Sequence, residues 1–275
     1  MKYIRIKSLI IGAAVAVGAL FSGCSSKTPN VSGGNIDEVT LNKGDLVAEI
    51  EIKDFGTIKA KLFPEAAPVG VENFQKLCES GYYKGKNIHR VIEGFMFQGG
   101  SLNGDGTGGD AAVNGGTFEV EKADNLRHFY GALCYANAGG QNTTQFYIVN
   151  NNKSNTFDSE IEYYKKQMNL CDERVKEYRD AGSSEGVEYF TRVKNTFQNY
   201  INSFEKFPEN VKALYNQRGG APSLDGNYTV FGQVVEGFDV IDAVSAVEVT
   251  ENAANEKSVP AKEIIISDIR VSAVE

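Results

Sequence analysis

The sequence predicts a mainly β protein, a closed barrel accompanied by two helices and carrying a separate helical insertion. Many short segments alternate apolar and polar residues between Gly-rich turns, which is typical of a barrel rather than of a parallel sheet. Two short segments have helical spacing, and residues 151–218 change to a helical period. With 275 residues, 41% of them apolar, the chain can bury one large core with an appendage.

The N-terminus is predicted to be a signal peptide over residues 1–23. Basic residues in MKYIRIK precede an apolar run of about 14 residues, which is too short to span a bilayer. The FSGC segment that ends at Cys24 resembles a bacterial lipobox, although Leu is commoner than Phe at its first position. The resemblance implies a lipid on Cys24 that anchors the protein to the membrane; an ordinary cleaved signal peptide with Cys24 free is the alternative. Residues 24–44 are interpreted as a flexible tether, which leaves 45–275 as the main domain.

The first two strands are predicted to form a hairpin. Residues 46–52 and 57–62 alternate apolar with polar side chains, and Asp54-Phe55-Gly56 between them makes the turn. The same three letters occur in protein kinases, but the kinase catalytic-loop and strand-lysine motifs do not accompany them here. The turn is therefore the interpretation of this tripeptide.

A helix and a series of strands follow the hairpin. Val71, Phe74 and Leu77 recur at helical spacing, and Gly81 is placed to end this helix. A second short helix is expected around residues 238–244. The expected strands are 87–92, 95–100, 131–137, 145–151, 228–235 and 263–271.

The insertion at 151–218 is predicted to be a helical hairpin. The first helix is expected to carry one apolar stripe, which begins after a Ser159…Glu162 capping box and ends before Gly182. A second helix is expected over residues 185–206, and a third, short helix is expected before Gly219. The stripe consists of Ile161, Tyr164, Met168, Cys171, Val175 and Tyr178. In this interpretation the two long helices bury each other's apolar faces. Because the same spacing occurs in coiled coils, a surface for a protein partner or a dimer is the alternative.

Composition and motifs disfavour several functional classes. The net charge of −8, with no basic run, argues against nucleic-acid binding. Residues 99–109, GGSLNGDGTGG, match the dinucleotide pattern G-x-G-x-x-G, but no helical pattern follows to face a pyrophosphate. The cysteines and histidines lack metal-site spacing, so neither a metal nor another cofactor is expected. These residues are Cys78, Cys134, Cys171, His89 and His128, of which Cys78 and Cys134 are predicted to be core residues.

Five ordered segments resemble the successive signatures of the cyclophilins, a family of peptidyl-prolyl cis-trans isomerases. They are HRVIEGFMFQGG, GTGG, ALCYANAG, TQFYIV and LDGNYTVFGQVVEGFDVID, and the likeness covers residues 46–150 and 219–272. The resemblance implies a closed eight-stranded antiparallel barrel with two capping helices and a peptide groove on its outer surface. The 99–109 loop is then expected along the groove rim, where glycines let a peptide backbone come close.

The reaction of this family needs no acid, base or metal. An X–Pro bond resists rotation with a barrier of about 20 kcal/mol, and in the twisted state the proline nitrogen can accept a hydrogen bond. An arginine in a water-poor groove donates that bond only in the twisted state, which is preferential binding of the transition state. Arg90 matches the family's catalytic arginine.

The resemblance also implies the other groove residues. Phe95, Gln98 and Asn137 complete the catalytic set with Arg90, the two amides holding the substrate backbone by hydrogen bonds. The expected substrate-binding residues are Met96, Ala136, Gln145, Tyr147, Leu224 and Tyr228. Of all these groove residues, Phe95, Met96 and Leu224 are expected to build the apolar pocket for the proline ring.

Three positions depart from the family pattern. Tyr147 replaces the usual Phe, so its hydroxyl needs a partner or a position at the rim. Tyr228 stands where many relatives carry His, and Ser223 stands where several carry the Trp against which the family's cyclic-peptide inhibitor stacks. We therefore expect weakened inhibitor binding. The insertion enters close to the groove, where it could gate substrate entry.

The sequence thus predicts a membrane-anchored isomerase acting on proline-containing segments of exported proteins outside the bacterial cytoplasm. Two alternatives stay open. The barrel could be a weakly catalytic peptide-binding or chaperone-like module, or it could be a scaffold for an insertion that carries the function. An isomerisation assay on an Arg90→Ala variant tests the first alternative, and deletion of residues 153–217 tests the second.

Overall fold

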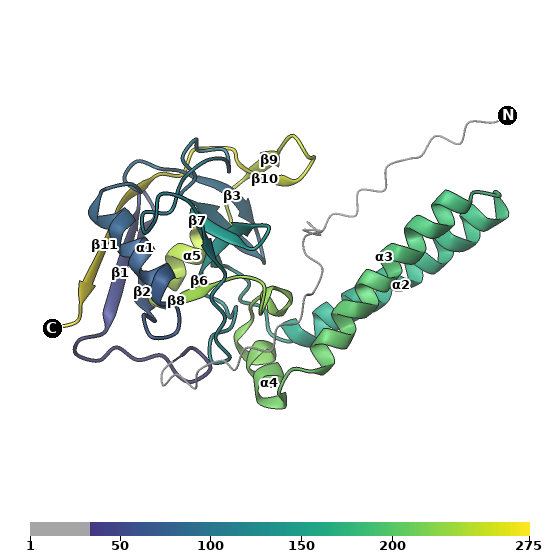
Figure 1. Cartoon of the computed structure of the whole chain (residues 1–275), viewed down its shortest axis with the longest axis horizontal. Helices are drawn as coiled ribbons and strands as arrows, with labels where there is room; N and C mark the ends of the chain where they lie inside the picture. Colours follow the sequence, from purple (N-terminus) through teal and green to yellow (C-terminus); the bar gives the residue numbers. More distant parts are fainter. Residues whose placement is uncertain (1–33) are drawn as a thin grey trace.

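Figure 1 shows the computed structural model, which describes residues 34–275. The expected signal peptide and the lipidation residue Cys24 lie outside the described residues. A curled antiparallel sheet carries helices α1 (Pro68–Glu79) and α5 (Phe238–Ser245), while the long helices α2 (Thr156–Asp180) and α3 (Ser184–Glu205) extend away from it. Within residues 34–275, no helix has both the length and the apolar character needed to cross a bilayer.

The sheet has the strand order β11-β1-β2-β8-β6-β7-β4-β3, with β5 paired to β7 off this path. Every neighbouring pair is antiparallel. The strands are β1 (Leu46–Ile52), β2 (Gly56–Leu62), β3 (Ile88–Ile92), β4 (Met96–Gly99), β5 (Phe118–Glu119), β6 (Ala132–Ala138), β7 (Gln141–Val149), β8 (Val230–Glu236) and β11 (Ile266–Ala273). The alternation predicted for β1 is observed, since Ile50 and Ile52 are buried while Glu51 between them is exposed.

The expected closed barrel is wrong in its closure, because the sheet is an open, curled half-barrel. Its end strands β11 and β3 form no ladder with each other; an isolated bridge joins Asn87 and Ile265, the residues directly before these strands. β3 lies instead next to β10 (Lys257–Pro260), which pairs with β9 (Val249–Glu251) in a separate two-stranded sheet. This small hairpin was not predicted, because its strands read only VTE and KSVP and show little alternation.

The core forms where α1 and α5 pack against the sheet. Val71, Phe74 and Leu77 of α1 are buried together with Ile241 and Val244 of α5. The helix predicted from Val71 to Leu77 is therefore confirmed. Its C-terminal turn is followed by Gly81 at φ +70°, a backbone conformation that favours glycine. Of the two cysteines expected in the core, Cys134 is fully buried and Cys78 is half-buried.

The insertion is a helical hairpin followed by α4 (Glu209–Arg218), as predicted. Tyr164 and Cys171 of α2 and Phe197 and Ile201 of α3 are buried in a cluster separate from the sheet core. The apolar stripe is therefore used to pair α2 with α3. In Figure 1 the two helices run side by side along their whole length.

The predicted start of α2 is wrong, because the helix begins at Thr156 and already includes Ser159 and Glu162. Asn216 of α4 supplies the cap that the sequence pattern could not show. Its side-chain oxygen accepts from the backbone N–H of Asp158 at 3.2 Å, and its Nδ2 donates to the Asp158 carboxylate at 2.9 Å. A contact with a third helix thus fixes the first turn.

Candidate functional site

The curl of the sheet brings most of the expected site residues onto neighbouring strands. Arg90 of β3 is the register partner of Gln98 on β4, and Gln98 is in turn the register partner of Tyr147 on β7. Side chains paired in this way lie on the same face of a sheet. Ala136 lies where the register between β6 and β7 shifts, directly before Asn137. The expected residues of the strands therefore converge from two pairs of consecutive strands, β3 with β4 and β6 with β7, that are distant from each other in sequence.

The apolar and aromatic residues expected in the groove, including the three expected to hold the proline ring, belong to one packed cluster, distinct from the main core. Met96 and Tyr147 are almost completely buried in it, and the others are half-buried. The half-buried members are Phe95, Ala136, Leu224 and Tyr228. Phe95 lies in the turn before β4. Leu224 belongs to a short 3-10 helix, η1 (Pro222–Leu224). We call this set of six residues the apolar cluster.

Tyr147 departs from both expectations for its hydroxyl. The side chain is buried rather than at a rim, and among residues 34–275 its Oη has no hydrogen bond of good geometry. The thiol of Cys134, its register partner on β6, offers only a weak acceptor. Burial raises the pKa of the Tyr147 phenol, so the group stays neutral. Its ring meets the Tyr228 ring edge-on, with 6.0 Å between the ring centroids.

Arg90 is held by an acidic residue that the sequence analysis did not identify. Its Nε and Nη2 donate to Oε1 and Oε2 of Glu256, each at 2.8 Å. Its third nitrogen, Nη1, lies 4.0 Å from Sδ of Met96, a member of the apolar cluster. The Arg90 side chain is 25% exposed, so its charge is partly withdrawn from water.

The expected amide residues make a chain of hydrogen bonds toward the glycine-rich loop. Nε2 of Gln98 donates to Oε1 of Gln145 at 2.9 Å, and Nε2 of Gln145 donates to the carbonyl of Gly106 at 2.9 Å. The 99–109 loop therefore lies beside the expected groove residues, as predicted. Gly106 has φ +91°, a backbone conformation that other residues rarely adopt.

Asn137 is oriented by two other bonds. Its Nδ2 donates to the carbonyl of Asn227 at 2.9 Å, and its Oδ1 accepts from the backbone N–H of Gly140 at 3.2 Å. Its side chain is half-buried, which leaves part of the amide at the surface. Its role toward a substrate backbone stays a prediction.

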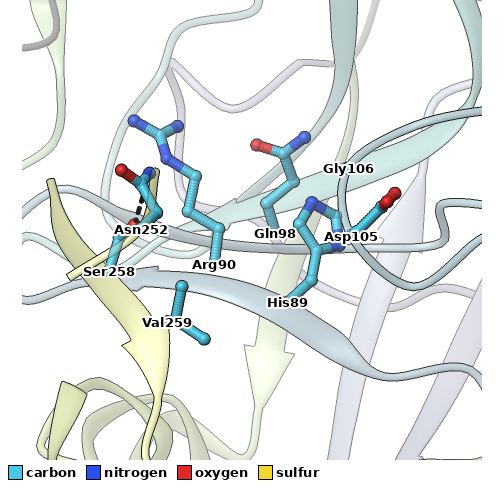
Figure 2. Close-up of a pocket in the computed structure, with 8 residues that line it drawn as sticks. All are labelled: His89, Arg90, Gln98, Asp105, Gly106, Asn252, Ser258 and Val259. Atoms are coloured by element: carbon cyan, nitrogen blue, oxygen red, sulfur yellow. Dashed lines mark hydrogen bonds between the residues drawn. The ribbon is translucent and has the colours of Figure 1, made fainter. Parts of the chain in front are cut away.

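A cavity of about 200 Å³ lies beside Arg90 (Figure 2). It is lined by His89, Arg90, Gln98, Asp105, Gly106, Asn252, Ser258 and Val259. Figure 2 shows Arg90 and Gln98 extending in the same direction from their strands, with Asn252 and Ser258 of the β9–β10 region beside Arg90. Burial, with a further contribution from the Arg90 charge, lowers the pKa of His89 to about 4. The cavity is therefore polar and holds a neutral imidazole at physiological pH.

The insertion reaches the segment that carries Leu224. Helix α3 packs near η1, and Glu160 of α2 accepts hydrogen bonds from Ser223 and, at 2.9 Å, from Oη of Tyr164. Ser223 is the position at which the resemblance implies a Trp in several relatives. The Ser223 side chain is therefore bound to the insertion through Glu160.

Comparison with known proteins agrees with the resemblance in the sequence. The family model described as "Cyclophilin type peptidyl-prolyl cis-trans isomerase/CLD" matches residues 47–168 and 179–271. A putative peptidyl-prolyl cis-trans isomerase of Staphylococcus haemolyticus is 32% identical over 217 residues, covering 78% of this chain and 86% of that protein. One of Staphylococcus aureus is 30% identical over 237 residues, covering 84% and 96%.

Two further relatives differ more in length or sequence. A putative bifunctional phosphatase/peptidyl-prolyl cis-trans isomerase of Streptococcus pyogenes is 35% identical over 219 residues, but the match spans only 37% of that protein. A crystal structure of a Cryptosporidium parvum cyclophilin type isomerase superposes with a TM-score of 0.53 at 22% identity, covering 84% of this chain and 99% of that one, which supports the fold. By sequence and by fold, this chain belongs to the cyclophilin-type peptidyl-prolyl cis-trans isomerases.

Proposed function

We propose that the protein isomerises X–Pro bonds in segments of exported proteins, using Arg90 as the catalytic residue. The observation that carries this proposal is the position of Arg90 between a carboxylate and the apolar cluster. One edge of the guanidinium binds Glu256, while Nη1 points to the side of Met96. A proline ring in the apolar cluster would therefore have its nitrogen near an N–H donor.

The chemistry follows from the change at the proline nitrogen. In the planar ground state its lone pair is delocalised into the carbonyl and accepts hydrogen bonds poorly. When the bond twists, the lone pair localises and can accept a bond from Arg90, so the interaction strengthens only in the transition state. The partial burial of Arg90 supports this role, because a hydrogen bond is stronger where less water competes for it.

Binding and alignment of the substrate fall to the other groove residues in this proposal. Phe95, Met96 and Leu224 would hold the ring, and Gln98 and Asn137 would bond the backbone on either side of it. The twisting bond is then held between fixed ends, which lowers the entropy cost of reaching the transition state.

An assay with a proline-containing tetrapeptide tests the catalytic role. We expect kcat/KM of Arg90→Ala to fall by about 10²–10³-fold, the usual effect of removing one transition-state donor. Arg90→Lys should be intermediate, because an ammonium lacks the planar fork that pairs with Glu256. Arg270→Ala removes an exposed arginine of β11 and serves as the control. Equal rates for wild type and Arg90→Ala would instead favour a peptide-binding module without turnover.

The location of the activity is part of the same proposal. The basic and apolar N-terminal pattern and the lipobox-like FSGC segment support export and a lipid on Cys24. Fractionation of cells that express wild type or Cys24→Ser tests the anchor. We expect the wild type in the membrane fraction and the variant released from it; membrane retention of both proteins would contradict the lipid anchor.

A further inference from the structure

We propose that Glu256 is a positioning residue for catalysis, which holds the guanidinium of Arg90 in the orientation that the transition state needs. This inference rests on the proposed function of Arg90. The two side chains are 166 positions apart in sequence and form a two-point ion pair, with both N···O distances at 2.8 Å. Both side chains are about three-quarters buried.

The two sides of the Arg90 guanidinium have different contacts: Nε and Nη2 bind Glu256, and Nη1 does not. A guanidinium has five N–H groups, and a carboxylate bound to Nε and Nη2 uses two of them along one edge. Nη1 stays outside this pair and lies 4.0 Å from Sδ of Met96, on the side of the apolar cluster. Glu256 therefore restrains Arg90 without occupying the group that would meet a proline nitrogen.

Glu256 is itself held by a compact loop. Oδ1 of Asn252 accepts from the backbone N–H groups of Ala254, at 2.8 Å, and of Glu256, at 3.0 Å. The backbone N–H of Asn252 donates to the carbonyl of Glu256 at 2.9 Å, which closes the loop. Ser258, which is almost completely buried, adds a hydrogen bond to the Glu256 carboxylate. The loop lies beside the strand of Arg90, because β10 packs next to β3.

Such an arrangement serves catalysis by ordering the arginine before substrate arrives. A free arginine side chain samples many rotamers, and fixing it during the reaction would add its entropy loss to the barrier. A bound carboxylate removes that cost in the resting enzyme, which is the usual function of residues that support a catalytic group. Loss of Glu256 should therefore lower kcat and leave KM nearly unchanged.

The experiment compares Glu256→Ala and Glu256→Gln with Glu251→Gln in the full chain. Glu251 is an exposed carboxylate of the same hairpin and provides the matched control. We expect kcat to fall by about tenfold in Glu256→Ala, with KM within about twofold of wild type, and less in Glu256→Gln, which keeps one acceptor. In an Arg90→Ala background, removing Glu256 should cause no further fall, because the two residues act as one unit.

Several results would overturn the inference. One is an unchanged or increased kcat in Glu256→Ala. Another is a fall in kcat on removal of Glu256 that is equally large when Arg90 is already replaced by Ala, which would indicate a general structural effect. A second readout does not depend on turnover: solvent exchange of the Arg90 Nε proton, followed by ¹⁵N NMR, should be slow in wild type and fast in Glu256→Ala. If the wild type proves inactive, the proposed function fails, and equal exchange in the two proteins would overturn the role of Glu256 separately.

Discussion

Two buried tyrosines on neighbouring strands allow the energetics of this site to be tested with one chemical change. Tyr147 of β7 and Tyr135 of β6 are both buried, and removing the hydroxyl of either leaves the ring in place. Oη of Tyr135 accepts from Nδ2 of Asn73 at 3.0 Å and donates to the carbonyl of Gly70 at 2.9 Å. Oη of Tyr147 has no such partners among the described residues. The same substitution should therefore change stability in opposite directions.

The magnitudes follow from the cost of burying a polar group. An unpaired buried hydroxyl costs about 1–3 kcal/mol, and the neighbouring Cys134 thiol offsets part of that cost as a weak acceptor. We therefore expect Tyr147→Phe to stabilise the protein by about 1 kcal/mol. Tyr135→Phe breaks two hydrogen bonds and leaves buried partners unpaired, so it should destabilise by about 1–3 kcal/mol.

Urea unfolding followed by far-ultraviolet circular dichroism measures both effects. The expected difference in the free energy of unfolding between the two variants is about 2–4 kcal/mol, well above the uncertainty of the extrapolation. If Tyr147→Phe loses as much stability as Tyr135→Phe, the Tyr147 hydroxyl must have a strong partner, and the reasoning is refuted. Catalysis adds a second check, because Tyr147→Phe restores the usual residue of the family and should keep full activity.

Two further predictions concern pH and inhibitor binding. The pKa of His89 is about 4 in the folded protein and about 6.5 in an unfolded chain, so unfolded chains take up the proton first and stability falls as the pH drops from 6.5 toward 4. This histidine should account for about 2 kcal/mol of the stability lost between about pH 7 and pH 5. The urea midpoint of His89→Asn should therefore fall less over this range than that of wild type, and an equally steep fall would show that His89 is not the cause. Ser223 stands where several relatives carry Trp, and it forms a hydrogen bond with Glu160 of the insertion. Titration calorimetry should therefore show that the family's cyclic-peptide inhibitor binds this protein more weakly than it binds Trp-bearing relatives. Equal affinity would refute this expectation.

The sequence predicted correctly those strands and helices whose apolar residues recur with a regular period. The alternation in β1 and β2, the stripe of α1 and the paired stripes of α2 and α3 each require one buried face, and a buried face is visible as a period of two or about 3.6 residues. Elements without such a period were missed or misplaced. The β9–β10 hairpin is too short to alternate, and α2 begins early because Asn216 of another helix caps it.

The candidate site divides in the same way. The ordered segments around Arg90, Phe95, Gln98 and Asn137 were recognisable because each is a contiguous run of letters that resembles a known family. Glu256 lies in none of these runs, and its hairpin has no pattern of its own. Its partnership with Arg90 exists only because β10 folds back beside β3.

The sequence by itself determined the family, the strands and helices with clear periodicity, and the identity of the groove residues, because all of these are encoded in neighbouring positions. Only the tertiary structure decided that the sheet stays open between β11 and β3, that the Tyr147 hydroxyl is buried without a strong partner, and that Arg90 is held by Glu256. These three features depend on distances between residues far apart in the chain. No local pattern specifies such distances, because they result from how the whole sheet curls around its core.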